Sequence, residues 1–197
     1  MIATEVPHLE FVTNIQQELQ KERVGIHLSD LDLCLKSSYY RKVNPQPLSM
    51  KQAVIFAIGL GVQQYMYPHA ETTYECDGIL CSPDANRVEV KTTRENAKNY
   101  ANGINHPHWI WRIKGYCHVL NVLDYYLDIV FVGTAEVKSY HLTFTQDEID
   151  LMWEEALVRK SILANAFRTH EPPMPDFHPD WLCKYCEHSG NCYIKKV

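Results

Sequence analysis

The residues best suited to chemistry lie between Asp77 and Lys91. Two short apolar runs, residues 78–81 and 88–90, flank the turn-forming sequence Ser-Pro-Asp-Ala-Asn, which predicts a β-hairpin. Alternation along the second strand places Glu89 and Lys91 on one face. If Asp77 from the partner strand reaches the same face, two carboxylates and an ammonium group converge. Carboxylates hold Mg²⁺ or Mn²⁺, and such an ion beside an ammonium group suits phosphodiester cleavage.

An alternating Glu-x-Lys also has an ordinary explanation. Any half-exposed strand can carry such an ion pair on its solvated face, where the pair adds little stability. The upstream acid, the Glu-Val-Lys sequence and the helix expected after it together resemble the PD-(D/E)xK nuclease core. That resemblance implies that Asp77 and Glu89 bind the metal ion, and that these two acids and Lys91 are the catalytic residues.

Three cysteines crowd the C-terminal tail as Cys183-x-x-Cys186-x5-Cys192. Buried structural cysteines need no common spacing, whereas a tetrahedral thiolate site does, so the spacing predicts a metal centre. Cys34 is the natural fourth ligand. A cluster that joins Cys34 to the tail would clip together both ends of the chain. By analogy with disulfide loops of this size, such a clip is worth ~4–5 kcal/mol.

A remote cysteine followed by C-x2-C-x5-C resembles the iron–sulfur nucleases of the RecB-like branch. These include the AddB nuclease domain and small CRISPR-associated nucleases that take part in spacer acquisition. The resemblance implies a [4Fe–4S] cluster on Cys34, Cys183, Cys186 and Cys192. Zinc is the competing metal, because four thiolates bind it equally well and His188 could replace Cys34 in a local Cys₃His site.

Helical spacing predicts the elements that position these groups. An amphipathic helix is expected at 8–24, a short helix capped by Ser29 carries Cys34, and a long helix runs from Ser49 to about residue 67. The apolar middle of the long helix is expected to be buried. In RecB-like nucleases the matching helix carries a Gly-x-x-x-His metal ligand. This chain has Gln63 in that position, and His69 follows the end of the helix.

A helix at about 107–122 follows the Glu-Val-Lys strand and carries Arg112 and Tyr116 one turn apart. The nuclease family has Gln-x-x-x-Tyr here, so the resemblance implies that Tyr116 orients substrate. Arg112 in place of the glutamine would contact a phosphate. A tyrosine in the core is the ordinary alternative for Tyr116.

The remaining pattern completes an α/β fold. A strand at 70–75 is expected to join the hairpin as three antiparallel strands before residue 92, and two more strands are expected at 124–133 and 137–145. Thr145 and Glu148 form the capping box of a last helix that ends near residue 167. This order predicts a PD-(D/E)xK nuclease core with a mixed central sheet flanked by helices, joined by the cysteine cluster.

Length and composition indicate one domain. The 197 residues are expected to form a single unit, with a helical part at 1–48, the nuclease core at 49–168 and a cysteine-rich tail at 169–197. The sequence starts without a secretory signal and has no apolar run long enough to span a bilayer, so a soluble cytoplasmic protein without membrane partners is expected. Seven cysteines in such a protein favour metal chemistry or buried thiols, and Cys76, Cys81 and Cys117 are expected to be small core residues.

Three classes of function fit the sequence. The first is a Mg²⁺- or Mn²⁺-dependent DNA nuclease, an exonuclease acting on single-stranded ends, whose partners would be CRISPR adaptation or recombination proteins. The net charge of −5 means that DNA must bind in a local groove. The second is a DNA-end-binding or docking module with the nuclease fold but a weakened metal site. The third is a zinc-stabilised structural protein with an incidental Glu-x-Lys.

Overall fold

The structure is a computed structural model that describes residues 13–15, 17, 24–68, 72–100, 104, 106–174, 180–184 and 186–192. Most of the helix expected at 8–24, together with His69, lies outside the described residues. The elements in chain order are η1 (Leu28–Asp30), α2 (Leu35–Val43), α3 (Met50–Met66), β1 (Tyr74–Cys76), β2 (Ile79–Cys81), β3 (Val88–Thr93), η2 (Ala97–Tyr100), α4 (Pro107–Leu120), β4 (Asp124–Phe131), β5 (Glu136–Thr143), α5 (Gln146–Thr169), α6 (Asp180–Lys184) and η3 (Ser189–Asn191).

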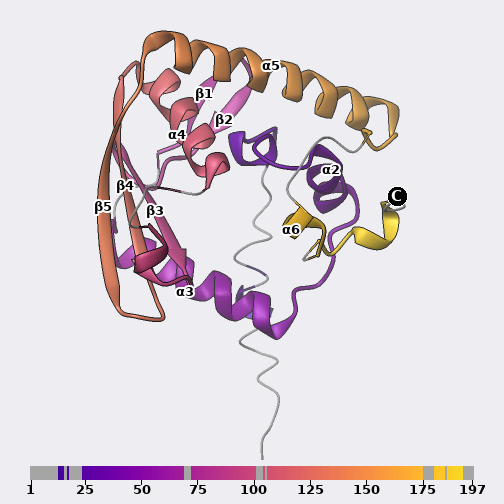
Figure 1. The fold of residues 1–197 in the computed structure, drawn as a ribbon. Coiled ribbons are helices and arrows are strands. Elements are labelled where there is room, and N and C mark those ends of the chain that lie inside the picture. The colour runs from indigo at the N-terminus through magenta and orange to yellow at the C-terminus, as the bar shows by residue number, and fades with distance from the viewer. Residues whose placement is uncertain are drawn as a thin grey trace, which may run out of the picture.

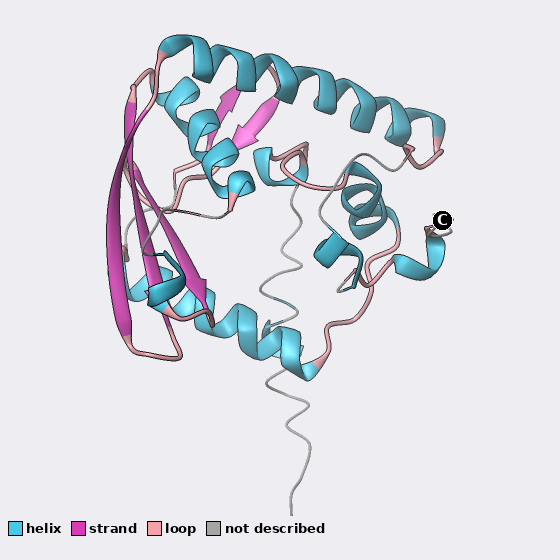
Figure 2. Cartoon of the chain, in the orientation of Figure 1, coloured by secondary structure: helices cyan, strands magenta, loops and turns pink. Residues whose placement is uncertain are grey.

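Strands β3, β4 and β5 form a mixed sheet. β3 and β4 are parallel, and β4 and β5 are antiparallel. The parallel pair is possible because the connection between them contains α4, which is long enough to cross from one end of the sheet to the other. β1 and β2 form a separate two-stranded sheet, visible apart from the larger one in Figure 2. The expectation of an α/β fold with a mixed central sheet is therefore confirmed.

The hairpin expected between residues 78–81 and 88–90 is wrong. The tight hairpin forms earlier in the chain, where β1 pairs with β2 and Tyr74 lies opposite Cys81. Asp77 and Gly78 make its two-residue turn with φ angles of 50° and 69°. Asp-Gly turns of this kind suit hairpins because their twist matches that of the strands. β3 pairs with β4 instead, with Glu89 opposite Leu127, so the expected three antiparallel strands reduce to two.

Side-chain caps begin the two longest helices. In α3, Gln52 N donates to Ser49 Oγ at 3.3 Å, and Ser49 N donates to Gln52 Oε1 at 2.8 Å. The cap expected for α5 is confirmed, since Thr145 N donates to Glu148 Oε2 at 2.9 Å and Glu148 N donates to Thr145 Oγ1 at 3.3 Å. The short helix expected to carry Cys34 is divided. η1 ends early, and Cys34 precedes the first residue of α2.

The core lies between the three-stranded sheet and helices α4 and α5 (Figure 1). Gly115 lets η1 approach α4 closely, because a Cβ at this position would lie 2.5 Å from Leu28 Cδ2. Strand β4 and helices α4 and α5 supply many of the fully buried apolar side chains, among them Leu127, Ile129, Phe131, Ile113 and Ile149. Cys81 and Cys117 are fully buried as expected, whereas Cys76 is only partly buried.

Helix α3 is not buried as its apolar sequence predicts. Ala53 is its one buried residue, and Val54, Ile55, Phe56 and Leu60 are exposed. Within the described residues α3 crosses the end of the sheet and contacts β3 (Figure 1). No helix in the described part of the chain combines the length and the apolar character needed to cross a membrane.

Candidate functional site

Glu89 and Lys91 lie on one face of β3 and form an ion pair. Lys91 Nζ donates to Glu89 Oε1. The Glu89 side chain is almost completely buried, with 1% of the residue exposed. A buried carboxylate is costly unless it is paired, so this is not the solvated ion pair of an ordinary surface strand. The face that carries them is the one that α4 covers.

Asp84 joins this pair from the loop before β3. Its Oδ2 accepts a hydrogen bond from Val90 N at 2.8 Å. Burial, together with the negative charge of Glu89, raises the pKa of Asp84 to about 7, while Lys91 and the hydrogen bond from Val90 act in the opposite direction. The influence of Glu89 on Asp84, through charge and through a side-chain hydrogen bond, indicates that the two carboxyl groups lie close together. Asp84 and Glu89 therefore form an acidic pair with Lys91 beside it.

Asp77 does not reach this site, which corrects the expectation that it shares a face with Glu89 and Lys91. It lies in the β1–β2 turn, and its Oδ2 accepts a hydrogen bond from Trp153 Nε1 of α5 at 2.9 Å. The backbone oxygen of Asp77 accepts from Lys160, also on α5. The reason is the tight turn, because a two-residue connection holds Asp77 at the tip of the small hairpin.

The sequence did contain a signal for Asp84. Pro83 and Asp84 stand before the Glu-Val-Lys sequence of β3, with four residues between, in the same order as the Pro-Asp of the PD-(D/E)xK pattern that the sequence resembles. Ser, Pro, Asp and Asn are typical of turns, so the sequence pattern alone predicts a turn at these residues. The chain does turn here, with an isolated bridge between Ala85 and Val88. The same residues thus form the turn and supply the acid.

Arg112 reaches the acidic pair from α4. Its Nη1 lies 3.7 Å from Glu89 Oε1, and its Nε donates to Asp32 Oδ2 at 3.0 Å. Burial alone would lower the pKa of Arg112, but the carboxylates of Asp32 and Glu89 outweigh burial and raise it. Arg112 is therefore a fixed positive charge. Asp32 orients it from a position 80 residues away in sequence, for which no local pattern gives a signal.

Tyr116 lies one turn after Arg112 on the same face of α4. Its hydroxyl donates to Ser82 O at 3.4 Å. Burial raises the pKa of Tyr116 well above its ordinary value, and the charges of Glu89 and Asp84 act in the same direction. Tyr116 is thus a neutral hydrogen-bond donor beside the acids. Arg112 therefore lies beside Glu89, and Tyr116 follows it on the same side of α4.

His108, in the first turn of α4, belongs to the same group. Burial, with the positive charges of Arg112 and Lys91, lowers the pKa of His108 to about 4 against the opposing effect of Asp32. The imidazole is therefore neutral at physiological pH. Sequence analysis did not single out His108, because a lone histidine at the start of a helix has no distinguishing spacing.

Gln63 lies over the other face of β3. Gly59 and Gln63 are four residues apart and share one face of α3, and Tyr67 directly follows the helix. A Cβ at Gly59 would lie 3.6 Å from Thr92 Oγ1, and Tyr67 donates to Asp128 Oδ2 at 2.8 Å. Asp128 pairs in register with Val90, and side chains on neighbouring positions of a strand alternate between faces. The strand therefore separates Gln63 from Glu89.

The acidic pair fits a divalent cation. Glu89 Oε2 is buried and has no hydrogen-bond partner within the described structure. Such an orphaned oxygen is unfavourable, and the proximity of Asp84 adds repulsion between like charges. Carboxylate oxygens are the preferred ligands of Mg²⁺ and Mn²⁺. Asp84 and Glu89 are therefore the residues that would hold such an ion.

The cysteine tail packs against the helix that Cys34 precedes. Cys186 Sγ lies 3.8 Å from Ser37 Oγ, in the first turn of α2. The ring of Tyr40, one turn further along, stacks on His188 with centroids 5.6 Å apart. Cys34 is buried at the start of the same helix. The fold thus brings the two cysteine-bearing segments together.

The position of His188 is compatible with both metal sites predicted for the tail, the four-cysteine site and the Cys₃His site. It is buried, and neither ring nitrogen makes a hydrogen bond in the described part of the chain. Its Nε2 lies 3.5 Å from Glu187 Oε1, and burial lowers the pKa of the imidazole. A neutral buried imidazole is a suitable zinc ligand. Both a four-cysteine site with Cys34 and a Cys₃His site remain compatible with the packing.

Comparison with known proteins supports the fold alone. A scan against protein-family models and a search of curated proteins found no match. Among solved structures, one titled "Crystal structure of SSO0001" is similar over 98% of this chain and 98% of its own, with 18% sequence identity and a TM-score of 0.62. The arrangement of elements therefore occurs in another protein of nearly the same extent.

Proposed function

We propose that this protein is a divalent-metal-dependent DNA nuclease of the PD-(D/E)xK superfamily, in the RecB-like branch, and that it degrades single-stranded DNA from its ends. The observation that carries the proposal is the convergence of Asp84, Glu89 and Lys91, with one buried carboxylate oxygen left without a partner. Two acids that can hold a cation, with a lysine beside them, are suited to metal-assisted phosphodiester hydrolysis.

The side chains around the acidic pair have distinct tasks. Asp84 and Glu89 would hold Mg²⁺ or Mn²⁺, which supplies Lewis-acid activation of the phosphate and of a water molecule. Lys91 offers an ammonium group that can pass from Glu89 to a phosphate oxygen, where it stabilises developing negative charge. The Arg112 guanidinium, fixed by Asp32, adds positive charge beside the strand. Tyr116 remains a neutral donor that can orient substrate.

The cysteine-rich tail is proposed to hold a metal cluster together with Cys34. Cys34, Cys183, Cys186 and Cys192 would hold a [4Fe–4S] cluster that clips the tail to α2, and its role would be structural. The thiolates are the ligands that such clusters use, and the contact of Cys186 with α2 supports this arrangement. By resemblance to the small CRISPR-associated nucleases, the partners would be proteins of CRISPR adaptation or of DNA recombination.

A matched pair of variants tests the nuclease assignment. Protein purified without oxygen is incubated with Mn²⁺ or Mg²⁺ and single-stranded DNA labelled at either end. Asp84→Asn is expected to lower the cleavage rate by on the order of 10²-fold or more, whereas Asp77→Asn keeps it. The opposite result would return the metal ligand to Asp77. Absence of cleavage at any manganese concentration would overturn the nuclease proposal, and binding of the same DNA would then distinguish a DNA-end-binding module from a structural protein.

A further inference from the structure

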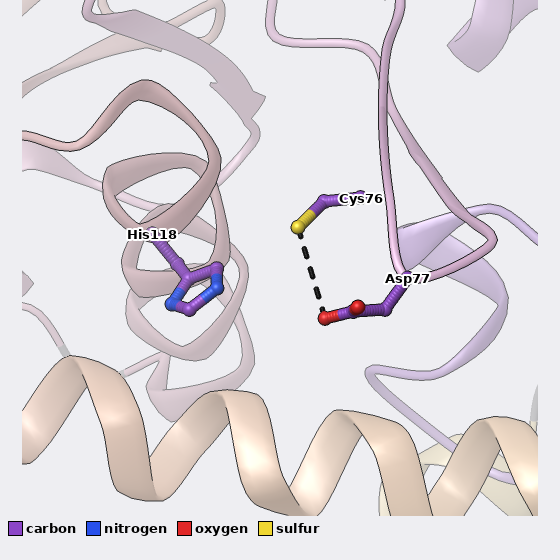
Figure 3. Close-up of side chains that lie close together, drawn as sticks. All are labelled: Cys76, Asp77 and His118. Carbon is purple, nitrogen blue, oxygen red and sulfur yellow. Dashed lines mark hydrogen bonds between the residues drawn. The ribbon is translucent and has the colours of Figure 1, made fainter.

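We propose that Cys76, Asp77 and His118 form a zinc site that is separate from the acidic pair and from the cysteine tail. One potential ligand atom from each of these residues lies within 4.8 Å of the others. Figure 3 shows the imidazole of His118, on the last turn of α4, facing the thiol and the carboxylate across the gap from the β1–β2 turn. Among the described residues, this is the one group of histidine, cysteine and acidic side chains with such close ligand atoms.

The hairpin turn presents two of the ligands. Cys76 ends β1, and Asp77 begins the two-residue turn in the left-handed conformation. A non-glycine residue in that conformation is uncommon, and aspartate tolerates it better than most. Lys160 from α5 holds the backbone oxygen of Asp77. The turn therefore fixes the adjacent thiol and carboxylate toward the same point.

Trp153 of α5 contacts both Asp77 and His118 and so orients these two side chains. Its indole nitrogen donates to Asp77 Oδ2 at 2.9 Å, and its ring stacks on the His118 imidazole with centroids 4.3 Å apart and an interplanar angle of 11°. Cys76 Sγ lies 3.8 Å from the same Oδ2. Metal sites commonly use such outer contacts to fix ligand orientation. Here a single buried tryptophan provides two of them.

The ligand types select the metal. Thiolate and imidazole disfavour Mg²⁺ and Mn²⁺, which prefer oxygen ligands, whereas zinc takes sulfur, nitrogen and carboxylate oxygen together. One thiolate and one carboxylate supply two negative charges, which balance the charge of Zn²⁺. Three protein ligands leave the fourth tetrahedral position for a water molecule. Zinc bound here would tie the β1–β2 turn to the C-terminal end of α4.

The experiment counts metal per chain. Full-length protein and its variants are equilibrated with Zn²⁺ without oxygen, freed of unbound metal and analysed for zinc and iron together. Cys76→Ser and His118→Ala are each expected to carry one zinc fewer than the unaltered protein, with the iron content unchanged. Cys81→Ser and His141→Ala are the matched controls, a buried cysteine and a histidine outside the cluster, and they are expected to keep the full zinc content.

Cobalt provides a second measurement that does not depend on the count. Co²⁺ bound through Cys76 gives a sulfur-to-metal charge-transfer band, which Cys76→Ser is expected to remove and Cys81→Ser to retain. Circular dichroism is used to check that each variant is folded. Equal zinc content in the unaltered protein, Cys76→Ser and His118→Ala would overturn the proposal. Loss in only one of the two variants would overturn the three-ligand site. Neither result affects the nuclease proposal, which the Asp84→Asn variant tests separately.

Discussion

Two aspartates seven residues apart, Asp77 and Asp84, have different environments and different chemistry. Asp84 is partly buried beside Glu89, and this position raises its pKa to about 7. Asp77 is exposed on a turn, where Trp153 and Lys160 hold it. A carboxyl group with a strongly raised pKa beside a second acid and a lysine is typical of a functional site. The environment of each residue, more than its type, distinguishes the candidate catalytic acid from the turn residue.

Lys91 is expected to be essential for cleavage. Lys91→Ala removes the ammonium group beside Glu89, and the loss of charge stabilisation should lower the cleavage rate by on the order of 10²-fold or more. Lys51→Ala, an exposed lysine on α3, is the matched control. The measurement is single-turnover cleavage of labelled single-stranded DNA at saturating Mn²⁺. An unchanged rate in folded Lys91→Ala would contradict the assignment.

Asp84 should make stability depend on pH when no metal is bound. Its pKa rises from an ordinary value of 3.8 to about 7 on folding, so between these values the folded state binds more protons than the unfolded state. Stability from this group is therefore present at low pH and is lost as pH rises toward 7.

Urea unfolding of chelator-treated protein measures this effect. From about pH 5 to about pH 7, the free energy of unfolding should fall more in the unaltered protein than in Asp84→Asn. Added Mg²⁺ or Mn²⁺ should reverse the fall, because the cation stabilises the ionised carboxylate. Identical pH profiles for the two proteins would show that Asp84 is not buried against Glu89.

Helix α4 connects the separate sites at the scale of secondary structure. One face carries Arg112 and Tyr116 toward β3, and its last turn carries His118 toward the β1–β2 turn. On the same helix, Gly115 allows η1 to lie close to α4. The helix also provides the crossover that makes β3 and β4 parallel. A displacement of α4 would therefore disturb several groups together.

Substitutions at two glycines, Gly115 on α4 and Gly61 on α3, test how closely each helix is packed. A side chain at Gly115 would collide with Leu28 and Met152, so Gly115→Val is expected to destabilise the protein by ~1–3 kcal/mol. Gly61 is also inside a helix, but a Cβ there meets nothing within 4 Å. Gly61→Ala should therefore stabilise by ~0.5–1 kcal/mol, because alanine favours helix. Urea unfolding of both variants gives the comparison, and destabilisation by Gly61→Ala would contradict the exposed position of α3.

At the scale of the whole molecule, long-range contacts hold the N-terminal segment in place. Arg159 of α5 donates to the backbone oxygens of Leu31 and Leu33, just before Cys34. The tail reaches the same region from the other end of the sequence, with Cys186 against Ser37. Residues 149 apart in sequence are thus neighbours. A metal centre at this junction would restrict the unfolded chain over most of its length.

The identity of the tail metal is expected to follow from two variants. Protein purified without oxygen should be brown and contain about four irons per chain if the centre is [4Fe–4S]. Cys34→Ser should lose the iron and ~4–5 kcal/mol of stability, whereas His188→Ala should keep the iron. The measurement is the absorption spectrum with iron, sulfide and zinc content. A colourless protein that loses a zinc with His188→Ala, but not with Cys34→Ser, would identify a Cys₃His site instead.

Features that depend on a few neighbouring residues can be predicted from the sequence. The capping box at Thr145 and Glu148, the strand containing Glu89 and Lys91, and the one-turn spacing of Arg112 and Tyr116 were all predicted correctly. Local backbone geometry sets caps, alternation and helical spacing, so a short stretch of sequence suffices. The Asp-Gly turn was equally readable, but the sequence interpretation placed the turn five residues later.

Which side chains contact one another depends on the tertiary structure. It placed Asp84 with Glu89 and moved Asp77 to Trp153, and it put Gln63 on the opposite face of β3. It also left α3 exposed, although the apolar sequence of this helix predicts burial. These outcomes depend on the parallel pairing of β3 with β4 and on contacts between residues far apart in the chain. No local pattern encodes them, because the free energy of each contact is realised only when the whole fold has formed.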